Sequence, residues 1–380
     1  MLKYTSLIIS LLLYTSCLNF TSMNNHKPPR AKKEPKELTI HGDNRIDDYF
    51  WMRLSDKQKE AKKPDLQTKN VIKYLTEENE YLKHKMNHTN ELQENLFHEI
   101  KNRIKKDDSS VPVTIKNYSY YTRYEKEQEY PFHCRKSIKK HAEEEILLNV
   151  PNMAKGHAYY SIGGRSVSPN EKLLIYGVDT VSRREYTLYV KNLETGEVLQ
   201  DKISNTTGSA VWANDNKNIF YTKQDPLTLR SHQIYRHVLG TSEDQDILVY
   251  EETDDTFGCY VSKSKSRNFI IIGSYQTLSN EYRYIDANKP DSEFKIIQKR
   301  KKNLEYSVYH YKEHFYILTN YKAKNFRLMK TLVAKPEKEH WEEVIAHKQD
   351  ILIEGIDIFK NYLVIEEREN GLTQIKVINW

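Results

Sequence analysis

The first residues along the chain that could do chemistry lie in one short stretch, HGDNRIDDYFWMR, which spans residues 41–53. It places a histidine beside carboxyl and guanidinium groups and runs directly into a cluster of aromatic residues. The polar members are His41, Asp43, Arg45 and Asp47, and the aromatic ones include Tyr49, Phe50 and Trp51. A histidine next to carboxylates could serve as a general base. The same residues could instead form a polar turn anchored by aromatic rings, so the stretch is either a site or a piece of structure.

Other patterns that carry chemistry are weak. A nucleophilic serine on a strand-to-helix elbow needs the spacing G-x-S-x-G, since the strained backbone there tolerates only small residues. The two nearest matches, TGSAV at 207–211 and IGSYQ at 272–276, lack the second glycine. The sequence contains neither of the metal-binding spacings C-x-x-C and H-E-x-x-H. The EEE at 143–145 is expected to form a solvated turn and not a set of metal ligands. We therefore predict no catalytic, cofactor-binding or metal-binding residue in this chain.

Composition sets the broad class of protein. The chain has 380 residues, of which 38% are hydrophobic and 29% charged, enough for a sizeable core and more than one domain. Tyrosine is abundant, with 28 copies, and glycine is scarce, with 12, a balance that favours strands. The net charge is +6 without a dominant basic run, so a solvated basic surface is expected and not nucleic-acid binding.

The first residues have the features of an export signal. Lys3 is followed by the apolar run LIISLLL at 7–13 and by YTSC at 14–17, and the apolar run is too short to span a bilayer. A cysteine after small residues resembles the lipobox of bacterial lipoproteins, in which Cys17 would be acylated. Tyr14 departs from that pattern, and an ordinary cleaved signal or a membrane anchor is the alternative. Residues 1–17 are thus expected to be a lipoprotein-type signal and residues 18–35 a flexible tether, on a periplasmic, membrane-anchored protein.

Two helices are expected next, within a segment at 36–110. Asp65 opens the first, in which apolar residues recur at helical spacing: Val71, Leu75, Leu82 and Met86, with Ile72 and Asn79 interleaved. Asn90 is expected to cap the second, whose apolar residues lie four apart at Leu92, Leu96, Ile100 and Ile104. The polar run KKDDSS at 105–110 ends it, and Pro112 begins a different pattern.

From residue 111 to residue 380 the pattern is that of β-structure. YTLYVKNLETGEVL at 186–199 alternates apolar and polar residues, and Thr195-Gly196 supplies a turn. Residues that could begin a new inner strand recur at intervals of 44, 50, 47 and 48 residues: Val167, Val211, Val261, Val308 and Ile356. A period in the forties with several strands per unit indicates a β-propeller; a large β-sandwich, the alternative, would not repeat at this period.

The blade count predicts an incomplete ring. Blade one covers roughly 111–162, four more reach about residue 351, and the sixth begins at Ile353 and is cut off at Trp380. The fold class is therefore mainly β, about five and a half blades preceded by a short α-helical segment.

Cys134 would lie in the first blade and Cys259 in the fourth. Because these blades face each other across a ring, we predict no disulfide between the two cysteines.

Several separated fragments resemble the prolyl oligopeptidase family, specifically its oligopeptidase B (protease II) branch. The stretch ELTIHGDNRIDDYFWMR at 37–53 fits the branch's pattern H-G-D-x-R-x-D-x-Y-x-W-x-R. Further matching fragments follow in the same order: SRREYTLYVKNLETGE (182–197), VWANDN (211–216), YRHVLGT (235–241), VYEETDDTF (249–257), EYSVYHY (305–311) and EERENGLTQIKVIN (366–379). The resemblance covers nearly everything from residue 28 onward.

The resemblance implies a seven-bladed propeller that caps an α/β-hydrolase domain, which is absent from residues 1–380. Residues 36–110 would then form a structural clasp and helices packed on that domain, with Asp43, Arg45 and Asp47 fixing the turn and Trp51 and its neighbours buried; His41 belongs to the same clasp. A catalytic role for His41 is the alternative. The family cleaves short peptides after Arg or Lys with a Ser-Asp-His triad, which would lie beyond residue 380, so this chain alone is expected to be inactive.

Three functions remain open from the sequence. The first is the propeller part of an exported oligopeptidase B, which admits short basic peptides and excludes folded proteins. The second is a membrane-tethered propeller that acts as a peptide- or protein-binding adaptor. The third is a lipid-anchored structural protein. A downstream reading frame encoding G-x-S-x-G, then Asp, then His would decide for the first.

Overall fold

The computed structural model describes residues 27–379, which divide after Lys105 into two compact units. The proposed export signal and Cys17 lie outside the described residues. The division comes a few residues before the predicted boundary at residue 110, because the strand that opens the propeller is extended backwards. The backbone N–H of Ser110 donates to the carbonyl of Thr122 at 2.8 Å, and that of Tyr124 to the carbonyl of Asp108 at 2.8 Å. Residues 108–110 therefore pair with the first blade.

The first unit begins with a β-hairpin. Strands β1 (Lys36–Ile40) and β2 (Asp43–Asp47) pair antiparallel, with Ile40 opposite Asp43. The two residues between them, His41 and Gly42, both have positive φ, 56° and 79°. Positive φ at both positions is the mark of a type I′ turn, which matches the twist of paired strands. The HG pair thus makes a hairpin turn, and His41 is exposed at its tip.

The polar residues of the clasp differ in their contacts within the described residues. Asp47 accepts a hydrogen bond from the backbone N–H of Tyr49 at 2.9 Å, so it fixes the turn after the hairpin. The side chains of Asp43 and Arg45 make no hydrogen bond or ion pair within residues 27–379, and a role for them in fixing the turn stays a prediction. The backbone conformation of His41 and Gly42 defines the hairpin turn.

Aromatic residues and the preceding segment are tied to this hairpin. Phe50 and Trp51 belong to a short 3₁₀ helix, η1 (Phe50–Met52), and the indole N–H of Trp51 donates to the carbonyl of Lys32 at 2.8 Å. The ammonium of Lys33 pairs with Asp48 at 2.8 Å. The last residues of the predicted tether at 18–35 are therefore attached to the clasp.

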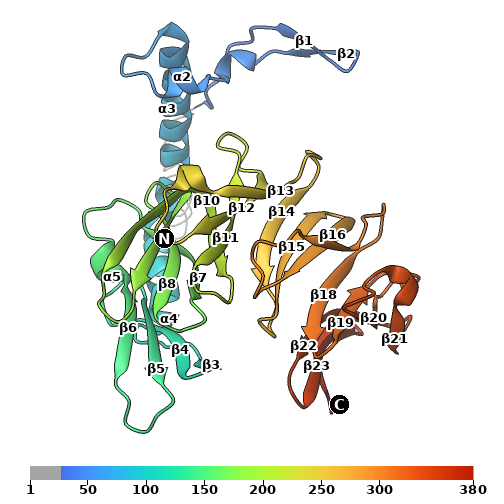
Figure 1. The fold of residues 1–380 in the computed structure, drawn as a ribbon. Helices are drawn as coiled ribbons and strands as arrows, with labels where there is room; N and C mark the ends of the chain where they lie inside the picture. Colours follow the sequence, from blue (N-terminus) through green and yellow to red (C-terminus); the bar gives the residue numbers. More distant parts are fainter. Residues whose placement is uncertain (1–26, 380) are drawn as a thin grey trace, which may run out of the picture. The chain divides into compact units, whose positions relative to one another are not determined.

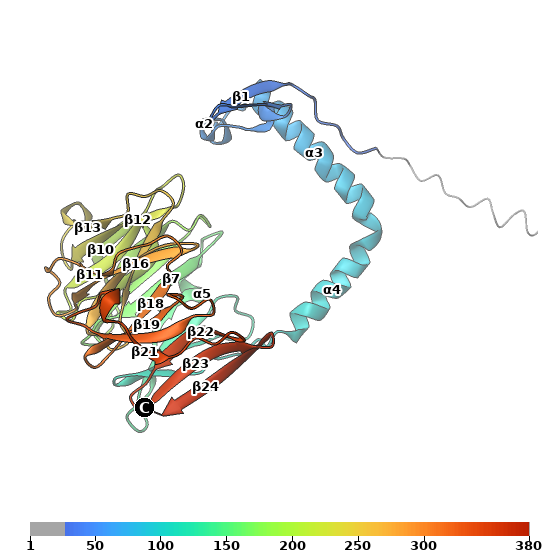
Figure 2. The same ribbon diagram turned by 90° about the vertical axis from the view of Figure 1, so that its right-hand side faces the viewer.

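Two helices complete the first unit, after the short α2 (Asp56–Lys59). Helix α3 (Leu66–Met86) begins as predicted, since Asp65 caps it by accepting the backbone N–H of Thr68 at 2.7 Å. Helix α4 (Asn90–Arg103) follows η2 (Asn87–Thr89), a single 3₁₀ turn that joins α3 to α4 (Figure 2). The prediction that Asn90 caps α4 is wrong: the chain stays helical through η2, and the amide of Asn90 donates to the side chain of Asn87 at 3.0 Å.

The apolar residues of both helices are largely exposed. Val71 is the one hydrophobic residue of α3 and α4 that is buried in the described structure. Nine others, and Ile104 directly after α4, are at least two-fifths exposed: Leu66, Ile72, Leu75, Leu82, Met86, Leu92, Leu96, Phe97 and Ile100. None of the described helices has both the length and the apolar character needed to cross a bilayer.

The described residues of the second unit contain five antiparallel sheets, which form six successive blades that we call blades 1–6 (Figure 1). Blade 1 holds β3 (Val113–Ile115), β4 (Tyr118–Arg123), β5 (Phe132–Ser137) and β6 (Glu144–Asn149), followed by α5 (Val150–Met153). Blade 2 holds β7 (Ser161–Val167), β8 (Leu173–Asp179), β9 (Tyr186–Asn192) and the first part of β10 (Val198–Trp212). Blade 3 holds the rest of β10 with β11 (Asn218–Gln224), β12 (Ser231–Val238), η3 (Glu243–Gln245) and β13 (Ile247–Glu251).

The remaining blades follow the same plan. Blade 4 holds β14 (Gly258–Lys263), β15 (Phe269–Gln276), β16 (Ser279–Asp286) and β17 (Lys295–Gln298). Blade 5 holds β18 (Tyr306–Tyr311), β19 (His314–Thr319), β20 (Arg327–Leu332), η4 (Lys338–His340) and β21 (Glu342–Ile345). Blade 6 holds β22 (Ile351–Ile358), β23 (Tyr362–Glu369) and β24 (Leu372–Asn379). The five residues at the predicted period, from Val167 to Ile356, each lie in the first strand of a blade.

Strand β10 is shared by two blades. It pairs with β9 from Val198 to Thr206 and with β11 from Thr206 to Trp212, with bulges on both sides of Thr206. Gly208 makes this possible: its φ is +86°, and a Cβ there would come within 2.6 Å of the Tyr186 ring. Blades 2 and 3 therefore form one continuous seven-stranded sheet.

The core lies between neighbouring blades. Five clusters of buried residues fill the space from blade 1 to blade 6, and their large members include Tyr176, Trp212, Phe220, Tyr306 and Leu363. Both described cysteines are buried free thiols in the predicted blades, Cys134 on β5 and Cys259 on β14. The prediction that they do not bond to each other is confirmed.

Candidate functional site between blades 3 and 4

Three loops line a pocket of about 970 Å³ at the junction of blades 3 and 4. They are the loop from β11 to β12, the crossover from β13 to β14, and the turn from β15 to β16. Strands alternate in direction within a blade, so these loops share the end at which each first strand begins. Residues 106–112 lead into blade 1 at the same end. We call it the crossover end of the propeller.

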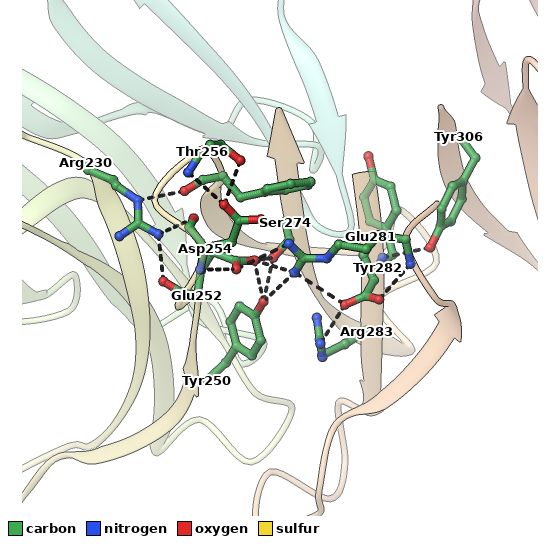
Figure 3. A network of polar contacts seen from close by, with 12 residues as sticks. Arg230, Tyr250, Glu252, Asp254, Thr256, Ser274, Glu281, Tyr282, Arg283 and Tyr306 are labelled. Atoms are coloured by element: carbon green, nitrogen blue, oxygen red, sulfur yellow. Dashed lines mark hydrogen bonds and ion pairs between the residues drawn. The ribbon is translucent and has the colours of Figure 1, made fainter. Parts of the chain in front are cut away.

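Arg230 holds the crossover in place from the β11–β12 loop. Its Nε donates to the carbonyl of Phe257 at 2.8 Å, and its Nη2 donates to the carbonyls of Glu252 and Asp254, both at 2.7 Å (Figure 3). Its Nη1 lies 3.4 Å from Asp255. A planar guanidinium can satisfy several carbonyls at once, which fixes the backbone of residues 252–257.

Glu252 is the buried acid beneath the pocket, with a side chain only 3% exposed. Its carboxylate accepts hydrogen bonds from Ser274 at 2.6 Å, Tyr250 at 2.7 Å and Arg300 at 2.6 Å. Burial alone would raise its pKa, but these hydrogen bonds, that of Arg300 foremost, outweigh burial and lower the pKa to about 2. The carboxylate therefore stays ionised over the physiological range.

Arg300 links Glu252 to further charged residues of blade 4. It follows β17, its backbone N–H donates to Glu281 at 2.8 Å, and Glu281 also pairs with Arg283 at 2.6 Å. The guanidinium of Arg300 lies 4.1 Å from the centre of the Phe257 ring, a cation–π contact under the crossover. Glu281 and Arg283 lie on β16 of blade 4, and Glu252 lies on the crossover from β13 to β14 (Figure 3). The pocket thus has a floor whose charges are largely satisfied.

The groups left for a ligand are carboxylates, hydroxyls and an aromatic ring. Asp255 is 96% exposed at the pocket edge. Hydrogen bonds from Thr228 hold the pKa of Asp225 below its usual range, and those from Thr256 do the same for Asp254. Tyr275 offers an exposed ring at the opposite wall. Such a wall can bind part of a peptide, but it holds no activated nucleophile.

Two histidine clusters elsewhere contain parts of a catalytic triad without completing one. His237 lies between two carboxylates, at 2.7 Å from Asp246 and 3.0 Å from Asp201, without a serine. His310 contacts the hydroxyl of Ser266 at 2.8 Å, without a carboxylate partner within residues 27–379. Within the same range no serine, histidine and carboxylate are joined in the order that nucleophilic catalysis needs.

Comparison with known proteins gives the family. A sequence model described as "Prolyl oligopeptidase, N-terminal beta-propeller domain" matches residues 28–380. The chain belongs to the prolyl oligopeptidase family. The resemblance found in the sequence is confirmed, and so is the mainly β, propeller-type fold.

Characterised relatives and solved structures of the family agree. Dipeptidyl aminopeptidase BI of Pseudoxanthomonas mexicana is 34% identical, over 99% of this chain and 53% of the relative. Protease 2 of Moraxella lacunata is 32% identical, over 93% of this chain and 50% of the relative. Oligopeptidase B from Leishmania major matches with a TM-score of 0.83 and 29% identity, over 93% of this chain and 51% of that structure. The chain therefore spans about half the length of these family members.

The residues predicted for this oligopeptidase-family chain are placed as follows. His41, Asp43, Arg45, Asp47 and Trp51 all lie in or next to the hairpin of the first unit, and His41 makes no side-chain hydrogen bond within residues 27–379. TGSAV and IGSYQ lie in strands β10 and β15. No group of three or more His, Cys, Asp or Glu side chains suited to a metal occurs among the described residues.

Sequence reasoning missed the network under the pocket. The fragment VYEETDDTF was matched only as a family motif, and nothing within it separates buried Glu252 from its exposed acidic neighbours. The partner that neutralises Glu252 is Arg300, 48 residues further along and one crossover later. The one indication in the sequence was that each residue lies in a segment connecting two consecutive blades, Glu252 between blades 3 and 4 and Arg300 between blades 4 and 5.

Proposed function

We propose that this chain is the propeller portion of an exported, oligopeptidase B-like serine peptidase. In this proposal the propeller admits short peptides and excludes folded proteins, and a Ser-Asp-His triad outside residues 1–380 cleaves after Arg or Lys. The observation that carries the proposal is the match of residues 28–380 to the propeller domain of a peptidase family, at about half the length of its peptidase relatives. Without that triad the chain would be inactive alone.

Two features of the described residues support this function. The pocket between blades 3 and 4 opens at the crossover end, where a peptide could contact exposed Asp255 and Tyr275. Helices α3 and α4 carry apolar residues that the described structure leaves exposed, which a hydrolase domain could cover. The names of the relatives, a dipeptidyl aminopeptidase and a protease, do not say after which residue they cleave. Cleavage after Arg or Lys is therefore the more specific part of the proposal.

A chimaera tests the proposal. The aligned N-terminal part of Moraxella lacunata Protease 2 would be replaced by residues 28–380 of this chain, and the unaltered enzyme would be the control. We expect the chimaera to cleave short chromogenic peptides that contain Arg or Lys and to leave folded proteins intact. A chimaera that folds, as judged by a cooperative melt, but cleaves no peptide would contradict the proposal.

A membrane-tethered adaptor is the second candidate. It is supported by a pocket with a rigid floor and no nucleophile within the described residues. A single monomer peak and a cooperative melt for residues 18–380 alone would favour the adaptor, because they would show that this part of the ring is a finished fold.

Attachment to the membrane through acylated Cys17 is part of the same proposal. It rests on the apolar run and on YTSC at 14–17, followed by a polar segment. The test compares the parent and Cys17→Ala in a bacterial host. Loss of the variant from the membrane fraction is expected, and equal retention would refute lipid attachment.

A further inference from the structure

A tight turn joins β23 to β24 in blade 6. The two strands pair antiparallel with Glu369 opposite Leu372, so Asn370 and Gly371 alone make the turn. Both have positive φ, 50° and 81°. This is again the type I′ geometry, for which Asn followed by Gly is a favoured pair. The turn therefore places an exposed asparagine directly before a residue that has no side chain.

The two groups of this turn that could react with each other are free. The side-chain amide of Asn370 makes no hydrogen bond within residues 27–379. The backbone N–H of Gly371 makes none in the same range, because the ladder bonds of the hairpin belong to Glu369 and Leu372. A Cβ built on Gly371 would meet no heavy atom within 4 Å, so the turn is open on that side.

Asn370 and Gly371 form the only Asn–Gly pair in the 380 residues. Asn303 has a similar backbone conformation, with a φ of 63°, and is also exposed. It precedes Leu304, however, whose side chain is buried and whose backbone N–H donates to the carbonyl of Lys301 at 3.0 Å. The nitrogen that follows the asparagine is thus engaged and shielded at Asn303 and free at Asn370.

Arg368 on β23 holds the turn closed. Its Nη1 donates to the carbonyl of Gly371 at 3.3 Å, and its Nε donates to Glu354 on β22 at 2.8 Å. The side chain of Arg368 is 44% exposed, so solvent weakens both contacts. Leu372, the first residue after the turn, is 67% exposed and adds little packing. Local opening of such a turn costs far less free energy than unfolding of the blade.

We propose that Asn370 is a site of spontaneous deamidation. When the turn opens, the backbone nitrogen of Gly371 attacks Cγ of Asn370. A bond forms between that nitrogen and Cγ, the bond from Cγ to Nδ2 breaks, and ammonia leaves with the proton of the attacking nitrogen. Water then opens the succinimide ring at one of its two carbonyls, which gives aspartate or isoaspartate. Water is the only co-reactant, and the inference does not depend on the proposed peptidase function.

The isoaspartate product should break the hairpin. Its main chain runs through Cβ and Cγ of the former asparagine, which lengthens a turn whose geometry depends on two residues of defined φ. Either product also adds a carboxylate next to Glu369. We therefore expect the pairing of β23 with β24 to loosen, beginning at the Glu369–Leu372 end.

Peptide mapping of residues 18–380 after ageing tests the site. The chain is kept folded at mildly alkaline pH, and conversion of each asparagine to aspartate and isoaspartate is followed by mass spectrometry. We expect Asn370 to convert at least several-fold faster than Asn303, the internal control with the same sign of φ. Conversion of Asn370 no faster than that of Asn303 would overturn the proposal.

The role of turn opening has its own test in Arg368→Gln. Loss of the bond to the Gly371 carbonyl should raise the deamidation rate of Asn370 about two- to tenfold, the factor that corresponds to one hydrogen bond. Lys360→Gln removes a positive charge from the turn between β22 and β23 and should leave the rate unchanged. Equal rates in the parent and Arg368→Gln would contradict this role.

Hydrogen exchange measures the consequence for blade 6. Fresh and aged samples of the parent are compared with those of Asn370→Gln, which lacks the reactive asparagine. We expect faster amide exchange in β23 and β24 of the aged parent alone, rising with its isoaspartate content. Unchanged exchange in a parent sample rich in isoaspartate would show that the product leaves the hairpin intact and would refute this part of the proposal.

Discussion

Replacing His237 by glutamine should destabilise the propeller strongly. The imidazole is 1% exposed and lies between Asp246 at 2.7 Å and Asp201 at 3.0 Å, two carboxylates that are themselves buried. Burial lowers the pKa of His237, but the hydrogen bonds and charges of Asp246 and Asp201 outweigh it, so the pKa is raised. The imidazolium therefore holds two buried negative charges at the junction of blades 2 and 3.

The size of the loss follows from what His237→Gln leaves behind. Glutamine can still donate to one carboxylate, but the positive charge disappears. Breaking a buried ion pair by removing one partner costs about 3–5 kcal/mol, because the remaining charge stays buried and uncompensated. With a total stability of about 5–15 kcal/mol for a typical domain, such a loss would be a large part of the whole.

The loss should depend on pH in a defined direction. Because the folded-state pKa of His237 is raised, its contribution is fully present below the unfolded value of about 6.5 and is lost as pH rises through the folded value. Urea unfolding of the parent and His237→Gln should therefore differ most near pH 6, and the difference should shrink towards alkaline pH.

A matched control and a refuting result complete the test. His232→Gln removes a half-buried histidine that makes no ion pair within residues 27–379, and it should change stability by no more than about 0.5 kcal/mol. A loss below about 1 kcal/mol for His237→Gln, or a loss that does not change with pH, would show that the buried imidazolium is not what holds these blades together.

Three further predictions concern other parts of the propeller. Gly208→Ala should lower the urea midpoint by the equivalent of about 2 kcal/mol or more, because it forces a side chain into positive φ and against Tyr186; an unchanged midpoint would contradict the shared-strand geometry. Arg300→Met should cost about 3–5 kcal/mol by leaving a buried carboxylate unpaired, and a neutral result would argue against the network beneath the pocket. Burial raises the pKa of Cys134 to about 11 and of Cys259 to about 12, so alkylation at neutral pH should require unfolding; rapid labelling of the native chain would show that they are accessible.

The repeat of the propeller could be predicted from the sequence because each blade begins with an apolar inner strand. The five residues at that period lie in the first strands of blades 2 to 6. The start of α3 was also predictable, since a capping interaction depends on residues only three apart, Asp65 and Thr68. Such features are set by local sequence or by a pattern repeated along it.

The polar networks could not be predicted, because their members meet only after the blades are stacked. Asp201 lies 36 residues before His237, and Arg300 lies 48 residues after Glu252. The prediction of a helix cap at Asn90 failed for a different reason. A single 3₁₀ turn keeps the chain helical between α3 and α4, so no cap residue is needed there. Asp43 and Arg45 resemble turn-fixing residues, but two positive φ angles already define that hairpin.

Turnover by the purified chain is the most direct measurement of the central claim, that this propeller serves a peptidase but holds no catalytic machinery. Residues 18–380 would be assayed with an Arg-Arg chromogenic peptide and labelled with a serine-directed fluorophosphonate. The account predicts no turnover above a mock purification and no labelled serine. Turnover that disappears as a serine of this chain becomes labelled would contradict it.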